Sequence, residues 1–111
     1  MAASDAVANK ATMLINRYHP VTSRKMFGGV GVFSAESGNM LALISSKDIL
    51  HFKVDDSNRS DYTDANMPQF KHMPYYKVPE EVMGDPEKLR EWVIKSAEVA
   101  ARKKPNKKKK K

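Results

Sequence analysis

The chain contains no cysteine among its 111 residues. This absence excludes disulfides and thiolate metal ligands, and it is typical of a reducing compartment. No apolar run approaches the ~20 residues that a helix needs to cross a bilayer. The first residues, Met1–Asp5, hold neither a basic segment nor an apolar one, so we expect no secretory signal. These absences predict a cytoplasmic protein, with the nucleus as the alternative in a eukaryotic source.

The patterns that carry catalysis are also missing. His19, His51 and His72 do not follow one another at i+3 or i+4, so zinc ligation has no support. Strand-like residues follow Gly28–Gly31, whereas a phosphate-binding loop needs a helix there. No serine stands in a nucleophile-elbow pattern. We therefore expect no enzyme, no metal and no cofactor, and a small-molecule site near Arg24, His51 or His72 is the open alternative.

Positive charge is in excess, and it is unevenly placed. Lysine and arginine outnumber aspartate and glutamate by 20 to 13. Residues 1–101 hold 12 positive and 13 negative residues, a net charge of −1, whereas residues 102–111 hold eight positive residues and no negative one. Those eight are Arg102, Lys103, Lys104, Lys107, Lys108, Lys109, Lys110 and Lys111.

This basic segment predicts a binding function of its own. Clustered lysines bind nucleic acid without sequence preference and in a salt-sensitive way. The segment also has the composition of a nuclear localisation signal or of a patch for anionic lipid. A solubilising tail without a partner is the remaining interpretation.

Two amphipathic helices are predicted at the ends of the folded part. The first spans about Asp5–Tyr18, with Ser4 as its N-cap and Pro20 just after its end. The second follows Asp85, which can cap it, and has Pro86 in its first turn. The buried stripe expected in the first helix is Val7, Ala11, Leu14, Ile15 and Tyr18. The stripe expected in the second is Leu89, Trp92, Val93, Ser96, Ala97 and Ala100.

Four closely spaced strands are predicted within residues 21–54. The pair Gly28-Gly29 separates the first two, because glycines can adopt the positive φ values of a two-residue hairpin turn. Met40–Ile44 is a continuous apolar run that suits a central strand. Apolar and polar residues alternate in Leu50–Val54, which places His51 on the solvent side.

Arg24 and Lys25 stand next to each other in the first strand. They can bind an anionic partner together. Alternatively, they can point to opposite faces of the strand, with Arg24 paired with an acidic residue at the edge of the core. The second, structural interpretation is slightly favoured.

The polar stretch Asp55–Gln69 is interpreted as a solvated loop with one turn of helix, and Phe70–Val78 as a short edge strand. The resulting order predicts an α+β fold of two layers, an antiparallel sheet of about five strands with the N- and C-terminal helices packed on one face. We assign residues 1–104 to this domain. Residues 105–111 are expected to be a disordered lysine-rich tail, because no apolar side chain besides proline offsets their ordering entropy.

Two sequence blocks and the last helix together form a recognisable pattern. Arg24–Gly29 reads Arg-Xaa-Met-Phe-Gly-Gly, and Tyr75–Pro79 reads Tyr-Tyr-Xaa-Val-Pro. Over about residues 13–101 the chain resembles the N-terminal domain of TfoX (Sxy), the bacterial competence regulator. The motif positions, which we expect to be structural, are Arg24, Met26, Phe27, Gly28, Gly29, Tyr75, Tyr76, Pro79 and Trp92.

The resemblance implies a two-layer α+β domain with an antiparallel sheet. Full-length members of the family promote transcription of competence genes alongside the cyclic-AMP receptor protein. We therefore expect a non-enzymatic interaction module that acts through a protein partner. The alternative is a nucleic-acid accessory protein that binds through the basic segment.

Overall fold

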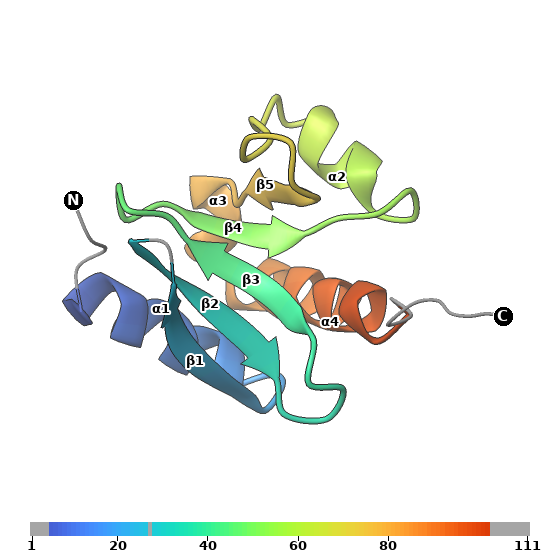
Figure 1. Cartoon of the computed structure of the whole chain (residues 1–111). Coiled ribbons are helices and arrows are strands. Elements are labelled where there is room, and N and C mark those ends of the chain that lie inside the picture. Colours follow the sequence, from blue (N-terminus) through green and yellow to red (C-terminus); the bar gives the residue numbers. More distant parts are fainter. Residues whose placement is uncertain (1–4, 27, 103–111) are drawn as a thin grey trace, which may run out of the picture.

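A computed structural model describes residues 5–26 and 28–102 as an α+β fold (Figure 1). In chain order the elements are α1 (Asp5–Asn16), β1 (Val21–Met26), β2 (Gly29–Ser34), β3 (Met40–Ile44), β4 (Leu50–Lys53), α2 (Arg59–Thr63), β5 (Tyr75–Lys77), α3 (Glu80–Met83) and α4 (Pro86–Arg102). The strands form an antiparallel sheet in the order β1-β2-β3-β4-β5. The terminal helices α1 and α4 lie on one face of this sheet. The predicted fold class is thus confirmed.

Helix α4 follows the local signals in the sequence. The Asp85 carboxylate accepts hydrogen bonds from the backbone N–H groups of Glu87 (3.1 Å) and Lys88 (3.3 Å), as an N-cap residue does. The predicted stripe faces the sheet: Val93 and its neighbours on that face are buried, and Trp92 is half-buried against them. Side chains of α4 therefore form much of the helix side of the hydrophobic core.

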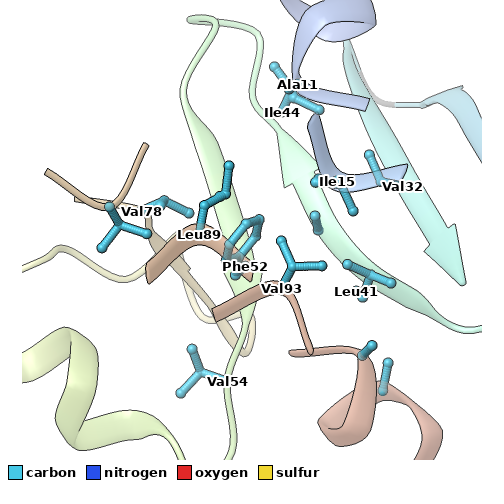
Figure 2. Packing of buried hydrophobic residues seen from close by; sticks show 14 of the residues in the cluster. Ala11, Ile15, Val32, Leu41, Ile44, Phe52, Val54, Val78, Leu89 and Val93 are labelled. Carbon is cyan, nitrogen blue, oxygen red and sulfur yellow. The ribbon is translucent and has the colours of Figure 1, made fainter. Parts of the chain in front are cut away.

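The hydrophobic core lies between the sheet and the two terminal helices. Figure 2 shows Ile15 of α1 and Val93 of α4 approaching Val32, Leu41 and Phe52 of the sheet. Each of these five residues is fully buried. Burial of such side chains supplies most of the free energy that stabilises a domain of this size.

Helix α1 differs in one detail from its predicted pattern. The exposed fraction of Val7 is 39%, and the buried residues of α1 are Ala8, Ala11 and Ile15. The helix ends at Asn16, whose side-chain oxygen accepts a hydrogen bond from the backbone of Val21 at 3.0 Å. The contact stripe is therefore centred on the i, i+3, i+7 line through Ala8, and Val7 lies at its rim.

The hairpin between β1 and β2 does not turn at Gly28-Gly29 as predicted. Strand β1 ends at Met26 and β2 begins at Gly29, which pairs with Met26. Gly28 has a φ of +79° and belongs to the turn, whereas Gly29 is a strand residue. A Cβ added at Gly29 would lie 2.3 Å from the carbonyl oxygen of Ile44. Gly28 is thus needed for conformation and Gly29 for the close approach of β3.

An irregularity in β3 lets two consecutive residues enter the core. Val32 pairs with Ala42 but Phe33 pairs with Met40, so Leu41 is an extra residue in β3. Both Leu41 and Ala42 are buried in the core cluster. A β-bulge of this kind explains why Met40–Ile44 reads as a continuous apolar run.

The segment between β4 and α4 is more ordered than the polar loop that the sequence predicts. It contains α2 as expected, but Asn58 and Tyr62 are fully buried. Strand β5 covers only Tyr75–Lys77 of the predicted strand, at the edge of the sheet. The short helix α3 was not predicted, because four residues are too few to show a helical period.

Candidate functional site

The face of the sheet opposite α1 and α4 is the candidate site, and we call it the open face (Figure 1). Strand pairing places on this face Arg24, Met26, Phe33, Met40, Leu43, His51 and Tyr75. Alternation along each strand sends their neighbours to the core instead.

Arg24 and Phe33 form a pair at the β1 side of the open face. The guanidinium carbon of Arg24 lies 4.6 Å from the centroid of the Phe33 ring. Lys25 points to the other face, where its Nζ lies 3.5 Å from a carboxylate oxygen of Asp5. The two basic residues thus take opposite faces, but Arg24 meets an aromatic ring and forms no ion pair with a described residue. An exposed guanidinium over a ring keeps its N–H groups available to a partner.

A cavity of about 500 Å³ opens beside this pair, between the β3–β4 turn and the segment that precedes β5. The apolar side chains that line it are Met26, Met40, Leu43, Ile49, Phe70 and Met73. Lys47 and Lys71 are exposed at its rim, and no aspartate or glutamate is among the described residues that line it. A cavity of this size and composition is typical of small-molecule sites.

His51 lines this cavity, so the prediction that it is exposed on the solvent side is wrong. Its exposed fraction is 5%. The segment before β5 folds back over β4, and the ring centroid of Phe70 lies 4.9 Å from that of His51. A hydrogen bond from the Phe70 backbone to the Tyr75 carbonyl, 2.7 Å long, holds this fold-back. Strand β4 is therefore buried on both faces, which the alternation rule does not anticipate.

Burial lowers the pKa of His51 and so favours the neutral form of its imidazole. Hydrogen bonds between the ring and the backbone of Leu43 and Ile49 oppose this shift, and nearby Lys77 adds to it. Its Nδ1 is buried and has no hydrogen-bond partner among the described residues. Buried polar atoms of native proteins are nearly always satisfied, so an exception inside a cavity points to function.

Tyr75 borders the other end of the open face. Its hydroxyl donates a hydrogen bond to the Met40 carbonyl at 3.3 Å. The ammonium group of Lys53 lies 5.3 Å from the centroid of its ring. Burial raises the pKa of Tyr75 to about 12, so it remains a neutral donor in the physiological range. Tyr75 thus joins β5 to β3 across β4.

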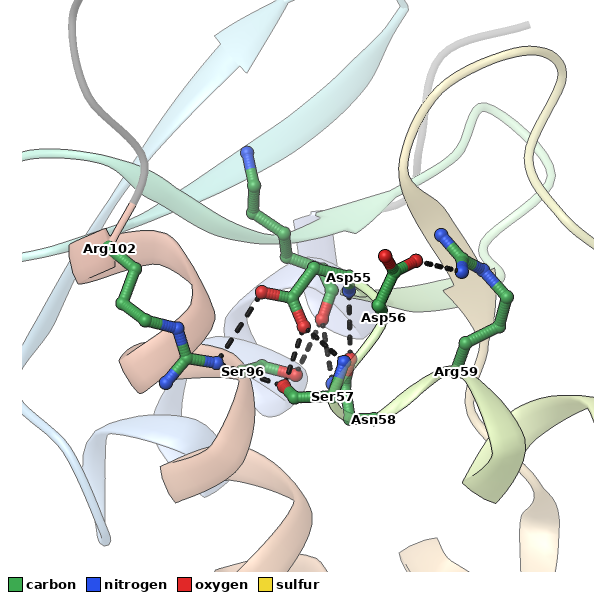
Figure 3. Close-up of polar contacts among 8 residues, drawn as sticks. Asp55, Asp56, Ser57, Asn58, Arg59, Ser96 and Arg102 are labelled. Carbon is green, nitrogen blue, oxygen red and sulfur yellow. Dashed lines mark hydrogen bonds and ion pairs between the residues drawn. The ribbon is translucent and has the colours of Figure 1, made fainter.

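A polar cluster at the C-terminal end of α4 contains Arg102, the one member of the basic segment among the described residues (Figure 3). An Nη of Arg102 lies 3.4 Å from Asp55 and donates to the Ser57 hydroxyl at 2.9 Å. Hydrogen bonds from Ser57 are the main reason why the pKa of Asp55 is lowered, and Arg102 contributes less. Arg59 pairs with Asp56 next to this cluster. Lys103, Lys104 and Lys107–Lys111 lie outside the described residues, as do Ser4 and Phe27.

Two buried polar side chains fix the start of the loop below this cluster. Asn58 donates to the Lys53 carbonyl at 3.2 Å and accepts from the Asp55 N–H at 2.8 Å. The Ser96 hydroxyl of α4 donates to the same Lys53 carbonyl at 3.0 Å (Figure 3). These bonds satisfy the backbone where β4 ends, and they explain a serine in the buried stripe of α4.

The remaining motif positions contact the helix side of the molecule. Tyr76 and Trp92 both lie against Tyr62, with ring centroids 5.8 Å and 4.6 Å away. Pro79 precedes α3 as its N-cap residue. Of the motif, Arg24, Met26 and Tyr75 therefore belong to the open face, and Gly29 lines its cavity.

The other two histidines do not join the site. His19 lies 2.7 Å from the Ser34 hydroxyl through its Nε2, at the far end of β2. Ser34 is buried, and its hydroxyl also accepts from the N–H groups of Glu36 and Ser37. His72 is exposed in the segment before β5.

The fold is an α+β domain in which helices cover one face of the sheet, and the segment before β5 covers β4 on the other face. The family model for the TfoX N-terminal domain matches residues 13–100, and the chain belongs to that family. No curated protein matches the chain. Within residues 5–26 and 28–102, no helix has the length and apolarity to cross a membrane.

Proposed function

We propose that this chain is a non-enzymatic interaction module with a regulatory role, and that the open face of its sheet binds a protein partner. The TfoX N-terminal family suggests a module of the competence or regulatory type. A transcriptional co-regulator that works through a protein partner is the specific form of this role that we propose.

The observation that carries the proposal is the exposed Arg24 held over Phe33. Arginine and aromatic residues dominate the binding energy of protein interfaces. The ring fixes the guanidinium group before a partner arrives, so less conformational entropy is lost on binding. Half-buried Met26 and Met40 lie on the same face and offer adaptable apolar contacts.

The geometry of the polar residues supports a module without catalysis. A catalytic serine needs a free hydroxyl, a base within reach and a third group that orients the base. His19 and Ser34 satisfy the distance, but two backbone N–H groups already donate to the buried Ser34 hydroxyl. His51 lines a cavity whose described lining residues include no carboxylate that could orient its ring.

The test compares two charge reversals on one strand. Arg24→Glu reverses the charge over Phe33 on the open face, and Lys25→Glu makes the same change in charge on the opposite face. Both residues are exposed, so neither variant should alter folding by more than ~0.5 kcal/mol. Proteins cross-linked to the full chain in its source cells would be identified by mass spectrometry, and their affinities measured with purified components.

We expect a partner that binds the wild type and Lys25→Glu with equal affinity. Arg24→Glu should weaken this binding at least about tenfold, as loss of an interface hot spot does. Phe33→Ala should act in the same direction. A partner that binds Arg24→Glu as tightly as the wild type would show that the open face is not the binding surface.

The second candidate function is nucleic-acid binding through the basic segment. The observation that favours it is the charge partition, with −1 on residues 1–101 and +8 on residues 102–111. The two candidates use different parts of the chain, so variants of one part can be tested without changing the other.

A further inference from the structure

We propose that the cavity on the open face binds a small organic carboxylate with an apolar body. The cavity shares Met26 and Met40 with the surface proposed for the protein partner, but Arg24 and Phe33, which carry that proposal, do not line it. The inference therefore goes beyond the interaction module and can fail or succeed separately from it.

The side chains that line the cavity indicate that its ligand has an apolar part. Met26, Met40 and Met73 reach it from two strands and from the segment before β5. Methionine side chains are flexible and polarizable, so they adapt to aromatic or aliphatic groups. Phe70 adds an aromatic wall. A volume of about 500 Å³ lies within the range of pockets that enclose small molecules.

The charged side chains around the cavity indicate that its ligand carries an anionic group. Lys47 and Lys71 stand at its rim, and its described lining residues include no carboxylate that could neutralise them. An ammonium group attracts anions without demanding a fixed geometry. A carboxylate on an otherwise apolar molecule can thus remain near the rim while the body enters the cavity.

The buried imidazole of His51 is an independent sign of a ligand. More than nine-tenths of this side chain is buried, and its Nδ1 has no hydrogen-bond partner among the described residues. A neutral imidazole has one N–H donor and one acceptor nitrogen. The backbone of Leu43 and Ile49 takes up the donor of the ring, so the unpaired Nδ1 is the acceptor nitrogen. A ligand carboxylate beside it favours a second proton on the ring, taken from solvent, and Nδ1 then donates to a carboxylate oxygen.

Isotope-labelled methionine methyl groups provide a direct test with the full chain. The protein has seven methionines, of which Met26, Met40 and Met73 line the cavity and Met13 is 71% exposed on α1. Phenylbutyrate is the carboxylate probe, and phenylbutanol is the uncharged probe of the same apolar body. We expect saturable shifts of the three cavity methyl signals with phenylbutyrate, and no saturable shift of the Met13 signal.

Two variants separate the parts of the proposal. Lys47→Gln combined with Lys71→Gln should weaken phenylbutyrate about fivefold, because the two cations attract its carboxylate. The loss for phenylbutanol should be much smaller, because phenylbutanol has no charge and only the contact of Lys71 with the Phe70 ring changes. Lys25→Gln combined with Lys88→Gln makes the same change in net charge away from the cavity and should leave both affinities unchanged. His51→Leu should weaken phenylbutyrate while the spectrum keeps the dispersion of a folded protein.

Three results would overturn the proposal. The first is the absence of saturable shifts at the cavity methionines, and the second is equal shifts at Met13. The third is equal affinity for phenylbutanol and phenylbutyrate in the wild type, which would indicate a pocket for an apolar side chain of a partner. None of these results bears on Arg24→Glu, so the test of partner binding remains separate.

Discussion

Tyr62 and Tyr75 are both buried, with exposed fractions of 1% and 3%, yet their hydroxyl groups differ. The Tyr75 hydroxyl donates to the Met40 carbonyl. The Tyr62 hydroxyl lies near the Ser96 hydroxyl but makes no hydrogen bond of regular geometry with a described residue. Burial raises the pKa of both phenols. A buried hydroxyl without a partner costs free energy, because it has lost water and gained nothing in exchange.

We therefore predict opposite effects for the same substitution. Tyr62→Phe should raise the free energy of unfolding by about 1 kcal/mol, since it removes an unsatisfied donor and keeps the ring contact with Trp92. Tyr75→Phe should lower it by about 0.5 kcal/mol, because a hydrogen bond of 3.3 Å is long and weak. Urea denaturation of the full chain measures both. A loss of stability in Tyr62→Phe would mean that its hydroxyl has a partner in solution.

His51 shows where single-residue prediction from sequence fails. The alternation in β4 correctly places Phe52 in the core and His51 on the opposite face. Whether that opposite face is covered depends on the segment before β5, some twenty residues further along the chain. Phe70 covers His51 through a long-range contact that no local period encodes. The sequence pattern therefore could not predict the cavity, although His51 was among the residues considered for a small-molecule site.

At the scale of elements, the glycines of the hairpins have different physical roles. A Cβ at Gly29 would collide with the backbone carbonyl of Ile44. Gly38, in the turn between β2 and β3, has a φ of +77°, and a Cβ added there would meet open space. The first glycine is therefore required for spacing between strands, and the second for backbone conformation.

The two roles predict different responses to substitution. Gly29→Ala should destabilise the protein by about 3 kcal/mol, because β3 must shift away from β2. Gly38→Ala should cost only about 1 kcal/mol, the penalty for a side chain in the left-handed region. Asparagine tolerates that region, so Gly38→Asn should recover part of the loss, and Gly29→Asn should recover none.

Thermal and urea unfolding of the four variants provides the measurement. Equal costs for Gly29→Ala and Gly38→Ala would contradict the distinction. Recovery of stability in Gly29→Asn would also contradict it, because a larger side chain cannot relieve a backbone collision.

Elements whose ends and buried face are encoded by neighbouring residues were predictable from the sequence. Features that depend on contacts between residues far apart in the chain were not. Helix α4 has a capping aspartate, a proline in its first turn and a regular apolar stripe, and it was predicted with its buried face. The start of β2 was not predictable. Gly28 and Gly29 are the same residue type, and only the close approach of β3 to Gly29 makes one a turn residue and the other a strand residue. The bulge at Leu41 likewise depends on pairing between β2 and β3.

At the scale of the whole molecule, the charge divides the chain into two parts. The segment 102–111 carries the excess of positive charge, and the rest is nearly neutral. Arg102, at the start of that segment, is engaged by Asp55 and Ser57 of the folded part. The lowered pKa of Asp55 means that this carboxylate stays charged near neutral pH. Arg102 is thus partly neutralised, and the lysines beyond it are expected to act independently of the open face.

The predicted consequence concerns duplex DNA. If the basic segment provides the affinity, the logarithm of the binding constant should fall with the logarithm of salt concentration by about 0.9 for each phosphate contacted. Deleting Pro105–Lys111 should remove most of the binding and flatten this slope. Changing Lys107–Lys111 to glutamine keeps the length and should have the same effect, because the interaction depends on charge. Fluorescence anisotropy with a labelled duplex at several salt concentrations measures each case.

Arg24→Glu is the matched control on the other part of the molecule. It should leave DNA affinity within about twofold of the wild type, because it leaves every cation of the basic segment, and hence every phosphate contact of that segment, in place. If the truncated chain bound DNA as tightly as the full chain, the folded part would contain the nucleic-acid site, and an effect of Arg24→Glu would locate it on the open face. If only the basic segment matters, one molecule has two separable surfaces, and a regulatory partner and a nucleic acid can occupy them together.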